Sequence, residues 1–528
     1  MIEDDALLTI QEASDLASKL MGRYVSTSNI SYLIQYGRVK KIGNNSSTKV
    51  LKEDLVKYYQ SSQDKRELEW KKELGEDLNW ALSFDYLTEK ERTKHVHRLH
   101  PYKGKFIPQL VEYFLDDHID RFKNEVFFKP GDIVLDPFCG SGTTLVEANE
   151  LGIHALGIDV SAFNAMISNV KIEKHDLFKL NNEIRKITIA LKEFISGKKY
   201  IQFENELTDT LARFNNSYFP SPEFKYQARQ GKIDENKYSI EKESEFLRIF
   251  NDLVRKYNIS VKQSHNESFL DQWYIAPVRD EIEFVFNLIH SLNDTDTKKL
   301  LAVILSRTMR SCRATTHADL ATLVDPVYST YYCRKHGKIC KPLFSILGWW
   351  ERYSQDTIKR LSDFSNLRTD TFQYCFSSDS RNIDIFAELK KRNLTFYNFV
   401  VNNKIDGIFS SPPYVGLIDY HEQHAYAYDL FNFTRNDQLE IGPLFKGQGR
   451  EARDSYVNGI SEVLLNCKKF LSTDYNIFLV ANDKNGLYPK IVEKAQMRIV
   501  NVFKRPVLNR TEKNKTPYSE MIFHIKER

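Results

Sequence analysis

Residues 131–159, GDIVLDPFCGSGTTLVEANELGIHALGID, constrain the fold more than any other segment. Ile133, Val134 and Leu135 form an apolar run within a strand predicted over Gly131–Phe138, as in a parallel sheet covered on both faces. A tight turn follows at Cys139–Gly142, and then a helix over Thr143–Leu151. A second strand, Ile153–Ile158, ends at Asp159. Strand, glycine turn, helix, strand and acid begin a Rossmann-like unit, so an α/β fold is predicted.

The same segment predicts a nucleotide-like ligand. Glycines let the backbone approach a ligand closely, and Asp159 can accept two ribose hydroxyls. Asp136 ends the first strand and faces the same crevice. The turn has neither the full G-x-G-x-x-G pattern nor the lysine of a phosphate loop, so a triphosphate is excluded. Taken alone, the residues also fit a plain strand-to-helix turn.

A second motif follows another predicted strand, Asp406–Ser410. Each proline removes a ladder donor, so the strand must end at the sequence Ser411-Pro412-Pro413-Tyr414. Together with DPFCGSGT at 136–143, SSPPY resembles the paired motifs of the amino-group DNA methyltransferases. In that family the first motif is the S-adenosylmethionine turn and the second is the catalytic turn. HPYKGKFIPQL, FSSDSRNIDIF and TPYSEMIFHIKER resemble, in order, the family's motif X, its motif III and its terminal strand.

The resemblance covers about 93–175 and 366–528. It implies S-adenosyl-L-methionine as cofactor and a Rossmann-like seven-stranded sheet interrupted by a large helical insert. The later strands are expected at Phe372–Ser378, Asp406–Ser410, Tyr475–Ala481, Met497–Lys504 and Glu520–Lys526. The implied cofactor site comprises Lys105, Phe106, Pro108, Asp136, Pro137, Phe138, Cys139, Gly140, Ser141, Gly142, Thr143, Asp159, Val160, Asp379 and Ser380. The implied catalytic residues are Ser411, Pro412, Pro413 and Tyr414.

The chemistry of an exocyclic amine explains the second motif. Its lone pair is shared with the ring, so an enzyme assists by accepting hydrogen bonds from the NH2 group. The Ser411 hydroxyl and the carbonyls of a proline turn accept without competing donors. Tyr414 offers a π-face to a base flipped out of double-stranded DNA. A rigid surface turn is the alternative.

Serine in first place and the sequel YHEQHAYAYDLF are similar to the cytosine-N4 enzymes of restriction–modification systems. Adenine N6 is the alternative target, and a non-catalytic DNA-binding regulator is the second alternative. His421 and Glu422 either line the base pocket or begin an ordinary amphipathic helix. Cytosine-C5 chemistry needs a cysteine in the catalytic turn, where there is none; Cys139 lies in the cofactor turn.

The first 60 residues predict a separate small domain. Thr9-x-x-Glu12 is a capping box for a helix from Ile10 to about Leu20, and Gly37 ends a second helix, Ser28–Tyr36. With the following strands and helix, the pattern resembles the winged helix-turn-helix of excisionase and MerR-like proteins, whose second helix enters the major groove. A protein-docking module is the alternative. The implied DNA contacts are Ser28, Asn29, Tyr32, Arg38, Lys40 and Lys41.

The remaining boundaries follow from charge and periodicity. Residues 61–92 predict a charged helical linker, 93–175 and 366–528 the two parts of the core, and 176–365 a mostly helical insert for target recognition. Insert residues suited to phosphate contacts are Arg310, Arg313, Arg334 and Lys335. A solvated basic face accounts for them equally well.

Six cysteines in 528 residues form no disulfide framework, which favours a reducing compartment. The spacing Cys333-x2-His336-x3-Cys340, with Cys312 or His317 nearby, could hold Zn2+. Packed cysteines and a surface histidine are the simpler explanation, so no metal is predicted. The chain has neither a long apolar run nor an apolar signal at its acidic N-terminus, so we expect a cytoplasmic protein without membrane contact. A cognate restriction endonuclease is an expected partner.

Overall fold

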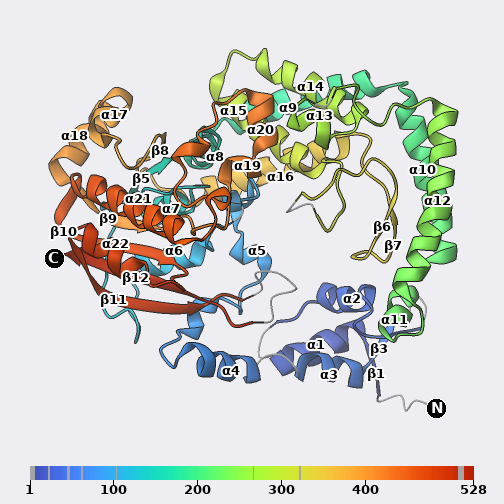
Figure 1. Ribbon diagram of the computed structural model, residues 1–528, viewed down its shortest axis with the longest axis horizontal. Helices are drawn as coiled ribbons and strands as arrows, with labels where there is room; N and C mark the ends of the chain where they lie inside the picture. Colours follow the sequence, from blue (N-terminus) through green and yellow to red (C-terminus); the bar gives the residue numbers. More distant parts are fainter. Residues whose placement is uncertain are drawn as a thin grey trace. The chain divides into compact units, whose positions relative to one another are not determined.

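The computed structural model describes residues 6–528 except 22–23, 44–47, 61–63, 103, 266, 320–322 and 509–515 (Figure 1). The chain divides into two compact units. One comprises Met1–Trp70, Thr188–Val285 and Thr308–Trp349, and the other Lys71–Ile187, Phe286–Arg307 and Trp350–Arg528. The predicted insert 176–365 therefore contributes to both units.

The second unit is built on a seven-stranded sheet of order β11-β12-β10-β9-β4-β5-β8. The strands are β4 (Ile133–Asp136), β5 (His154–Asp159), β8 (Gln373–Ser377), β9 (Ile405–Ser410), β10 (Leu471–Ala481), β11 (Met497–Pro506) and β12 (Ser519–Glu527). The pairs among β8, β5, β4, β9 and β10 are parallel, whereas β12 is antiparallel to both β10 and β11. All seven strands coincide with segments predicted from the sequence, and the expected α/β architecture is confirmed.

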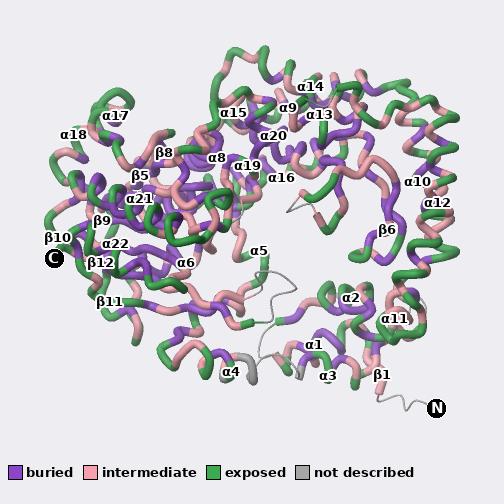
Figure 2. The backbone as a smooth tube through the Cα atoms, viewed as in Figure 1, coloured by how far each residue is buried: buried purple, intermediate pink, exposed green. Residues whose placement is uncertain are grey.

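Buried residues fill the central strands of this sheet, such as β5 and β9, which are largely purple in Figure 2. On one face Ile133, Leu135 and Ile408 pack in a single cluster with residues of four helices. On the other face the ring of Phe114 lies 5.6 Å from Phe409 and 4.9 Å from Phe478, centroid to centroid. The parallel strands carry continuous apolar runs because helices cover both faces of the sheet there, so side chains on either face are shielded from water.

The helices of the first face are α17 (Ile385–Arg392), α18 (Leu394–Asn403), α21 (Arg450–Lys468) and α22 (Tyr488–Lys494). Phe114 belongs to α6 (Pro108–Leu115), which contacts α7 (Thr143–Glu150). Two further helices, α8 (Ala162–Ile172) and α20 (Ala425–Phe431), flank the segments that follow β5 and β9. Short helices also occur before the sheet, at α4 (Asp64–Leu74) and α5 (Glu89–Arg92).

The described residues between 6 and 60 share a hydrophobic cluster of their own, within the first compact unit. The elements of this segment are β1 (Leu7–Thr9), α1 (Ile10–Met21), α2 (Thr27–Gln35), β2 (Lys41–Ile42), β3 (Lys49–Leu51) and α3 (Lys52–Gln60). The expected capping box is present: the Thr9 N–H donates to Glu12 at 2.8 Å, and the Glu12 N–H donates to the Thr9 hydroxyl at 3.2 Å. Ser26 caps α2, and Gly37 follows it with φ +63°.

Between residues 176 and 365 the chain is mainly helical, in agreement with its periodicity. The helices are α9 (Leu177–Ile195), α10 (Lys199–Tyr218), α11 (Glu223–Arg229), α12 (Glu235–Tyr257), α13 (Phe269–Trp273), α14 (Ala276–His290), α15 (Thr295–Ser311) and α16 (Leu347–Ser365). A two-stranded hairpin of β6 (Tyr331–Cys333) and β7 (Lys338–Cys340) interrupts them. This hairpin was not predicted from the sequence.

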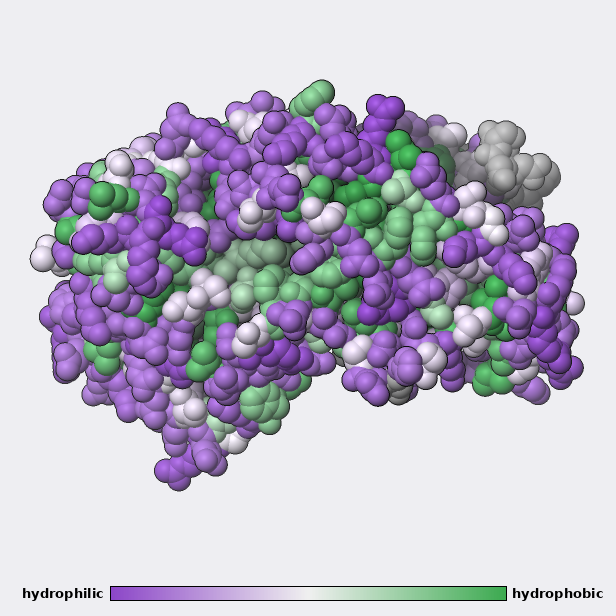
Figure 3. All heavy atoms as spheres, turned by 90° about the horizontal axis from the view of Figure 1, so that it is seen from above, coloured by the Kyte–Doolittle hydropathy of each residue, from purple (hydrophilic) through white to green (hydrophobic). Residues whose placement is uncertain are grey.

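No helix in the described part of the chain is long and apolar enough to span a membrane. The face drawn in Figure 3 is predominantly hydrophilic, with hydrophobic residues in scattered patches.

Candidate active site

The sheet order brings together the two segments that the sequence analysis singled out. β4 lies between β5 and β9, so the strand order reverses at β4, and the turns after β4 and β9 leave the same edge of the sheet. Open parallel sheets bind ligands at such a switch point. The Ser410 hydroxyl, at the end of β9, donates a 2.5 Å hydrogen bond to Oδ1 of Asp136, at the end of β4. The glycine turn and the Ser411-Pro412-Pro413-Tyr414 turn are therefore neighbours.

A single pocket of about 830 Å³, its mouth included, is lined by residues of both turns. The predicted residues that line it are Lys105, Phe106, Pro137, Phe138, Cys139, Gly140, Ser141, Thr143, Asp159, Val160, Asp379, Ser380, Ser411 and Pro413. The lining residues that were not predicted from the sequence are Tyr102, Gly104, Asn164, Tyr420, Leu439, Glu440 and Ile441.

The glycine turn has a backbone that only glycine adopts readily. Gly140 has φ +52°, and a Cβ added there would lie 3.0 Å from the Tyr102 ring. Gly142 has φ +76°, and a Cβ there would lie 2.9 Å from the Ser168 hydroxyl, behind the turn. Gly140 therefore keeps space open on the pocket side, whereas Gly142 permits close packing against α8.

Asp159 is half-buried in this pocket and oriented by three donors. Its Oδ2 accepts from the Gly140 N–H at 2.8 Å, and its Oδ1 accepts from the Ser161 N–H at 2.8 Å and the Asn164 amide at 3.2 Å. Burial raises the pKa of Asp159 to about 6 despite these bonds. Burial likewise raises the pKa of the Cys139 thiol, which therefore stays protonated at neutral pH.

Two buried polar atoms in the pocket lining have no hydrogen-bond partner among the described residues. They are Oγ of Ser141 and Oδ1 of Asn164. An unpaired buried polar atom is costly, so a polar ligand that satisfies both atoms gains affinity from them.

Glu440 contributes a second carboxylate to the lining and is 6% exposed. It accepts from the backbone N–H of Tyr420 at 3.2 Å and of His421 at 2.9 Å, and its Oε1 pairs with the His421 ring. His421 is fully buried, and its Nε2 faces the Asn436 N–H at 3.2 Å. No local motif points to Glu440, because it reaches the site only when the chain folds back after α20.

In the Ser-Pro-Pro-Tyr turn, Ser411 and Pro413 reach the pocket, while Pro412 is buried and does not line it. The Tyr414 hydroxyl donates to Oε1 of Glu520, in β12, at 2.9 Å. Ser411 is also hydrogen-bonded to this hydroxyl. The Tyr414 ring is therefore held at its far end by the sheet.

Comparison with known proteins supports the family expected from the motifs. A family model described as DNA methylase, of the N6/N4 class, matches residues 22–170. The type II methyltransferase M.MjaII of Methanocaldococcus jannaschii is 47% identical over 524 residues, which cover 98% of this chain and 97% of that protein. The chain belongs to the type II DNA methyltransferases of the N6/N4 family.

Shorter stretches of this methyltransferase are similar to other proteins. The type II methyltransferase M.MvaI of Kocuria varians is 32% identical over 117 residues, 22% of this chain and 24% of that protein. A tRNA (guanine(10)-N2)-dimethyltransferase of M. jannaschii is 32% identical over 114 residues, 20% of this chain and 32% of that protein. No solved structure matches the chain.

Some predicted cofactor residues of the methyltransferase support the pocket without lining it. Pro108 starts α6 and is buried, Gly142 packs against α8, and Asp136 is bound by Ser410. Two others that do line the pocket are held in place. Asp379 accepts from Arg381 Nε at 2.9 Å and Nη2 at 2.6 Å, and the Ser380 hydroxyl donates to the Pro137 carbonyl at 2.6 Å.

Neither His421 nor Glu422 lines the pocket of the methyltransferase. His421 supports Glu440 from behind, and Glu422 is exposed and pairs with Arg435 at 3.0 Å. Both residues instead lie in the short helix α19 (Tyr420–Gln423), with His421 buried and Glu422 exposed, as the amphipathic-helix alternative expects, and the histidine positions a pocket carboxylate.

The DNA-binding candidates of the methyltransferase differ in exposure. Ser28, Asn29, Tyr32, Arg38 and Lys40 are exposed, and Lys41 is half-buried. In the insert, Arg334 and Lys335 are exposed and Arg310 is half-buried. Arg313 is buried at 8% exposure, and its Nε donates to the Arg310 carbonyl at 3.1 Å, which fits a structural role better than a phosphate contact.

Proposed function

We propose that this protein transfers a methyl group from S-adenosyl-L-methionine to the N4 amino group of a flipped cytosine in double-stranded DNA. The observation that carries the proposal is the single pocket lined by the glycine turn after β4 and by Ser411 and Pro413 after β9. A nucleotide-like ligand and an amino-group acceptor would meet there. In a restriction–modification system, this methylation would protect the DNA site from cleavage by a cognate restriction endonuclease.

The residues around the glycine turn fit the cofactor. Asp159 suits the ribose hydroxyls, and the backbone at Gly140 lies open to a close ligand. The unpaired atoms of Ser141 and Asn164 are further polar partners for it. S-adenosyl-L-methionine, when bound, supplies an electrophilic methyl group on sulfur.

The catalytic turn would raise the nucleophilicity of the target amine. The Ser411 hydroxyl and the turn carbonyls accept hydrogen bonds from the N–H groups of the amine. The prolines have no N–H that would compete as a donor. Holding the amine in line with the methyl group supplies the rest of the acceleration through proximity. The aminium formed by transfer is acidic, so no strong base is needed beforehand.

The bond from Tyr414 to Glu520 supports a role for the ring in holding the base. A ring fixed at its hydroxyl end offers a preorganised face to an extruded base, and stacking of this kind is worth about 1–3 kcal/mol. Serine in place of the acid or amide of many adenine enzymes favours cytosine. Adenine N6 is the second candidate, because both bases present an exocyclic amine to the same acceptors.

We propose further that the N-terminal domain, as a winged helix-turn-helix, reads DNA. Ser28, Asn29 and Tyr32 lie exposed on α2, which would enter the major groove. Exposed Arg38 and Lys40 follow the helix and suit phosphate contacts.

Mass spectrometry of nucleosides tests the target atom. DNA modified by the purified protein is digested and compared with standards, with a Tyr414→Ala preparation as control. N4-methylcytosine is the expected product. N6-methyladenine would transfer the proposal to the second candidate, and 5-methylcytosine would refute the mechanism. Binding of S-adenosylhomocysteine without any methylated base on DNA would instead favour a non-catalytic regulator.

A further inference from the structure

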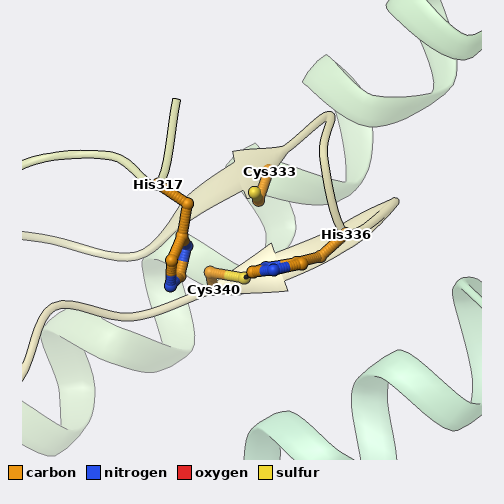
Figure 4. Close-up of side chains that lie close together, drawn as sticks. All are labelled: His317, Cys333, His336 and Cys340. Carbon is orange, nitrogen blue, oxygen red and sulfur yellow. Dashed lines mark hydrogen bonds between the residues drawn. The ribbon is translucent and has the colours of Figure 1, made fainter. Parts of the chain in front are cut away.

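Four side chains far from the pocket residues in sequence converge around the β6–β7 hairpin. They are His317, Cys333, His336 and Cys340 (Figure 4). One potential ligand atom of each lies within 4.8 Å of the others. Both cysteines are buried and have free thiols. Cys312, the alternative fourth residue considered from the sequence, is not part of the cluster that the described residues form.

The spacing of the donors fits a tetrahedral ion. Cys340 Sγ lies 3.5 Å from His336 Nδ1. Bond lengths of about 2.3 Å for zinc–sulfur and about 2.0–2.1 Å for zinc–nitrogen give a sulfur–nitrogen edge of about 3.5 Å in a tetrahedron. The His317 and His336 rings lie edge to face, with centroids 4.4 Å apart and ring planes at 68°, and each ring has a donor nitrogen within 4.8 Å of the other ligand atoms.

The turn between the strands holds the first two donors in place. The N–H groups of His336 and Gly337 both donate to the Cys333 carbonyl, at 3.0 and 2.7 Å, and Gly337 has φ +64°. The turn therefore fixes Cys333 and His336 relative to each other.

The fourth donor, His317, is oriented by a neighbour. Its Nδ1 lies 2.7 Å from the Tyr331 hydroxyl, and this hydroxyl also accepts from the His317 backbone N–H at 3.1 Å. A histidine whose Nδ1–H is held in this way presents Nε2 as a ligand, an arrangement that recurs around metal sites.

From this geometry we propose that His317, Cys333, His336 and Cys340 bind a structural Zn2+ ion. A Cys2His2 set supplies all four ligands of a tetrahedral site, which is typical of structural and not catalytic zinc. Two thiolates balance the charge of the ion. The proposal departs from the prediction that no metal is bound, which rested on three closely spaced ligands and an undecided fourth.

The ion would join the loop that carries His317 to the hairpin. The hairpin in turn supports α11, since Lys225 Nζ donates to the Lys335 carbonyl at 2.8 Å. Arg229, at the end of α11, donates to the Tyr36 carbonyl at 2.7 Å, directly after α2. Zinc would therefore stabilise the support of the helix proposed to read DNA.

Metal analysis of the full-length protein tests the proposal. The protein is expressed in zinc-supplemented medium, purified without a histidine tag or chelator, and its metals are measured by plasma mass spectrometry. We expect one zinc per chain, and at least a tenfold loss of zinc in Cys333→Ser, Cys340→Ser and His317→Ala. Cys312→Ala and His265→Ala, which alter a cysteine and a histidine outside the cluster, should keep full zinc content.

A second measurement covers variants that fail to fold. Co2+ exchanged into the wild-type protein should give the intense visible absorption bands of tetrahedral cobalt, together with near-ultraviolet thiolate-to-metal bands. In His317→Ala the visible bands should be weaker. Full-length protein without zinc that takes up no Co2+ would overturn the proposal. So would a Cys333–Cys340 disulfide in protein purified under reducing conditions, or zinc content that is unchanged in both cysteine variants.

Discussion

The Ser410 hydroxyl donates a 2.5 Å hydrogen bond to Oδ1 of Asp136, 274 positions earlier in the chain. The bond joins the last residue of β9 to the last residue of β4, where the sheet order reverses. Asp136 is 1% exposed, and burial raises its pKa to about 6, although the bond from Ser410 acts in the opposite direction. This carboxyl group, expected to touch the cofactor, instead fixes the two turns that do form the pocket.

Replacing this carboxyl group should change the pH dependence of stability. The folded pKa, about 6, exceeds the unfolded value of about 3.9, so the native state binds the proton more tightly, and stability falls as pH rises through this window. Asp136→Asn keeps the acceptor oxygen but does not titrate. Between pH 4 and pH 7 the variant should lose about 2–3 kcal/mol less stability than the wild type. Ser410→Ala should make the loss larger. Denaturant unfolding at both pH values measures the free energy of unfolding of each protein. An equal change in this free energy between pH 4 and pH 7 in all three proteins would refute the raised pKa of Asp136.

Gly140→Leu should abolish cofactor binding. A side chain there begins 3.0 Å from the Tyr102 ring and fills the pocket. Gly486→Leu is the matched control, because Gly486 has a similar φ of +61° with nothing within 4 Å of its added Cβ. Calorimetry with S-adenosylhomocysteine should show normal binding to the control and none to Gly140→Leu. Equal affinities would place the cofactor elsewhere.

Tyr414 variants separate the ring from the hydroxyl. Tyr414→Ala should lower kcat/KM about 5- to 150-fold, which corresponds to the loss of about 1–3 kcal/mol of base stacking. Tyr414→Phe keeps the ring but loses the bond to Glu520, and its activity should fall much less. Both should bind S-adenosylhomocysteine normally, because Tyr414 does not line the pocket. A larger defect in the phenylalanine variant would show that the hydroxyl, and not stacking, matters.

Glu440→Ala should destabilise the segment that closes the pocket. Removal of the carboxylate leaves buried His421 without its partner, at a cost of about 1–3 kcal/mol. S-adenosylhomocysteine affinity should fall as well, since Glu440 lines the pocket. Glu451→Ala, an exposed carboxylate in the first turn of α21, is the control. Thermal unfolding with and without S-adenosylhomocysteine measures both effects, and similar results for the two variants would remove Glu440 from the site.

Arg38→Ala and Lys40→Ala should weaken DNA binding independently of sequence. Each lost phosphate contact should reduce the slope of log K against log salt by roughly one unit. Lys391→Ala, an exposed lysine of α17 in the other compact unit, should leave the slope unchanged. Fluorescence anisotropy over a salt series measures the slopes. If the first two variants behave like the control, the N-terminal domain docks protein and not DNA.

The strands and turns of the core could be predicted from the sequence because their signals are local. Ile133–Leu135 form an uninterrupted apolar run, and Pro412 and Pro413 end β9 wherever the rest of the chain lies. Glycine at 140 and 142 marks positive φ in the same way. These features depend on backbone geometry and on burial of adjacent residues, which a short segment encodes.

Partners distant in sequence could not be predicted in this way. Glu440 enters the pocket after the chain folds back, and Asp136 meets Ser410 only because β9 pairs with β4. Arg313 lies in a basic segment that suggests a phosphate contact, but its side chain is buried in the folded protein. The sequence offers both Cys312 and His317 as the fourth residue of the proposed zinc site, and only the folded structure places His317 beside Cys333, His336 and Cys340.

The sequence by itself determined the α/β class, the seven strands and the family motifs, since hydrophobic patterning, prolines and glycines act on the nearest few residues. The tertiary structure alone decided which polar groups line the pocket, which support it, and which four donors converge on the hairpin. A side chain's role depends on which groups surround it after folding, and burial then sets its charge and its available partners.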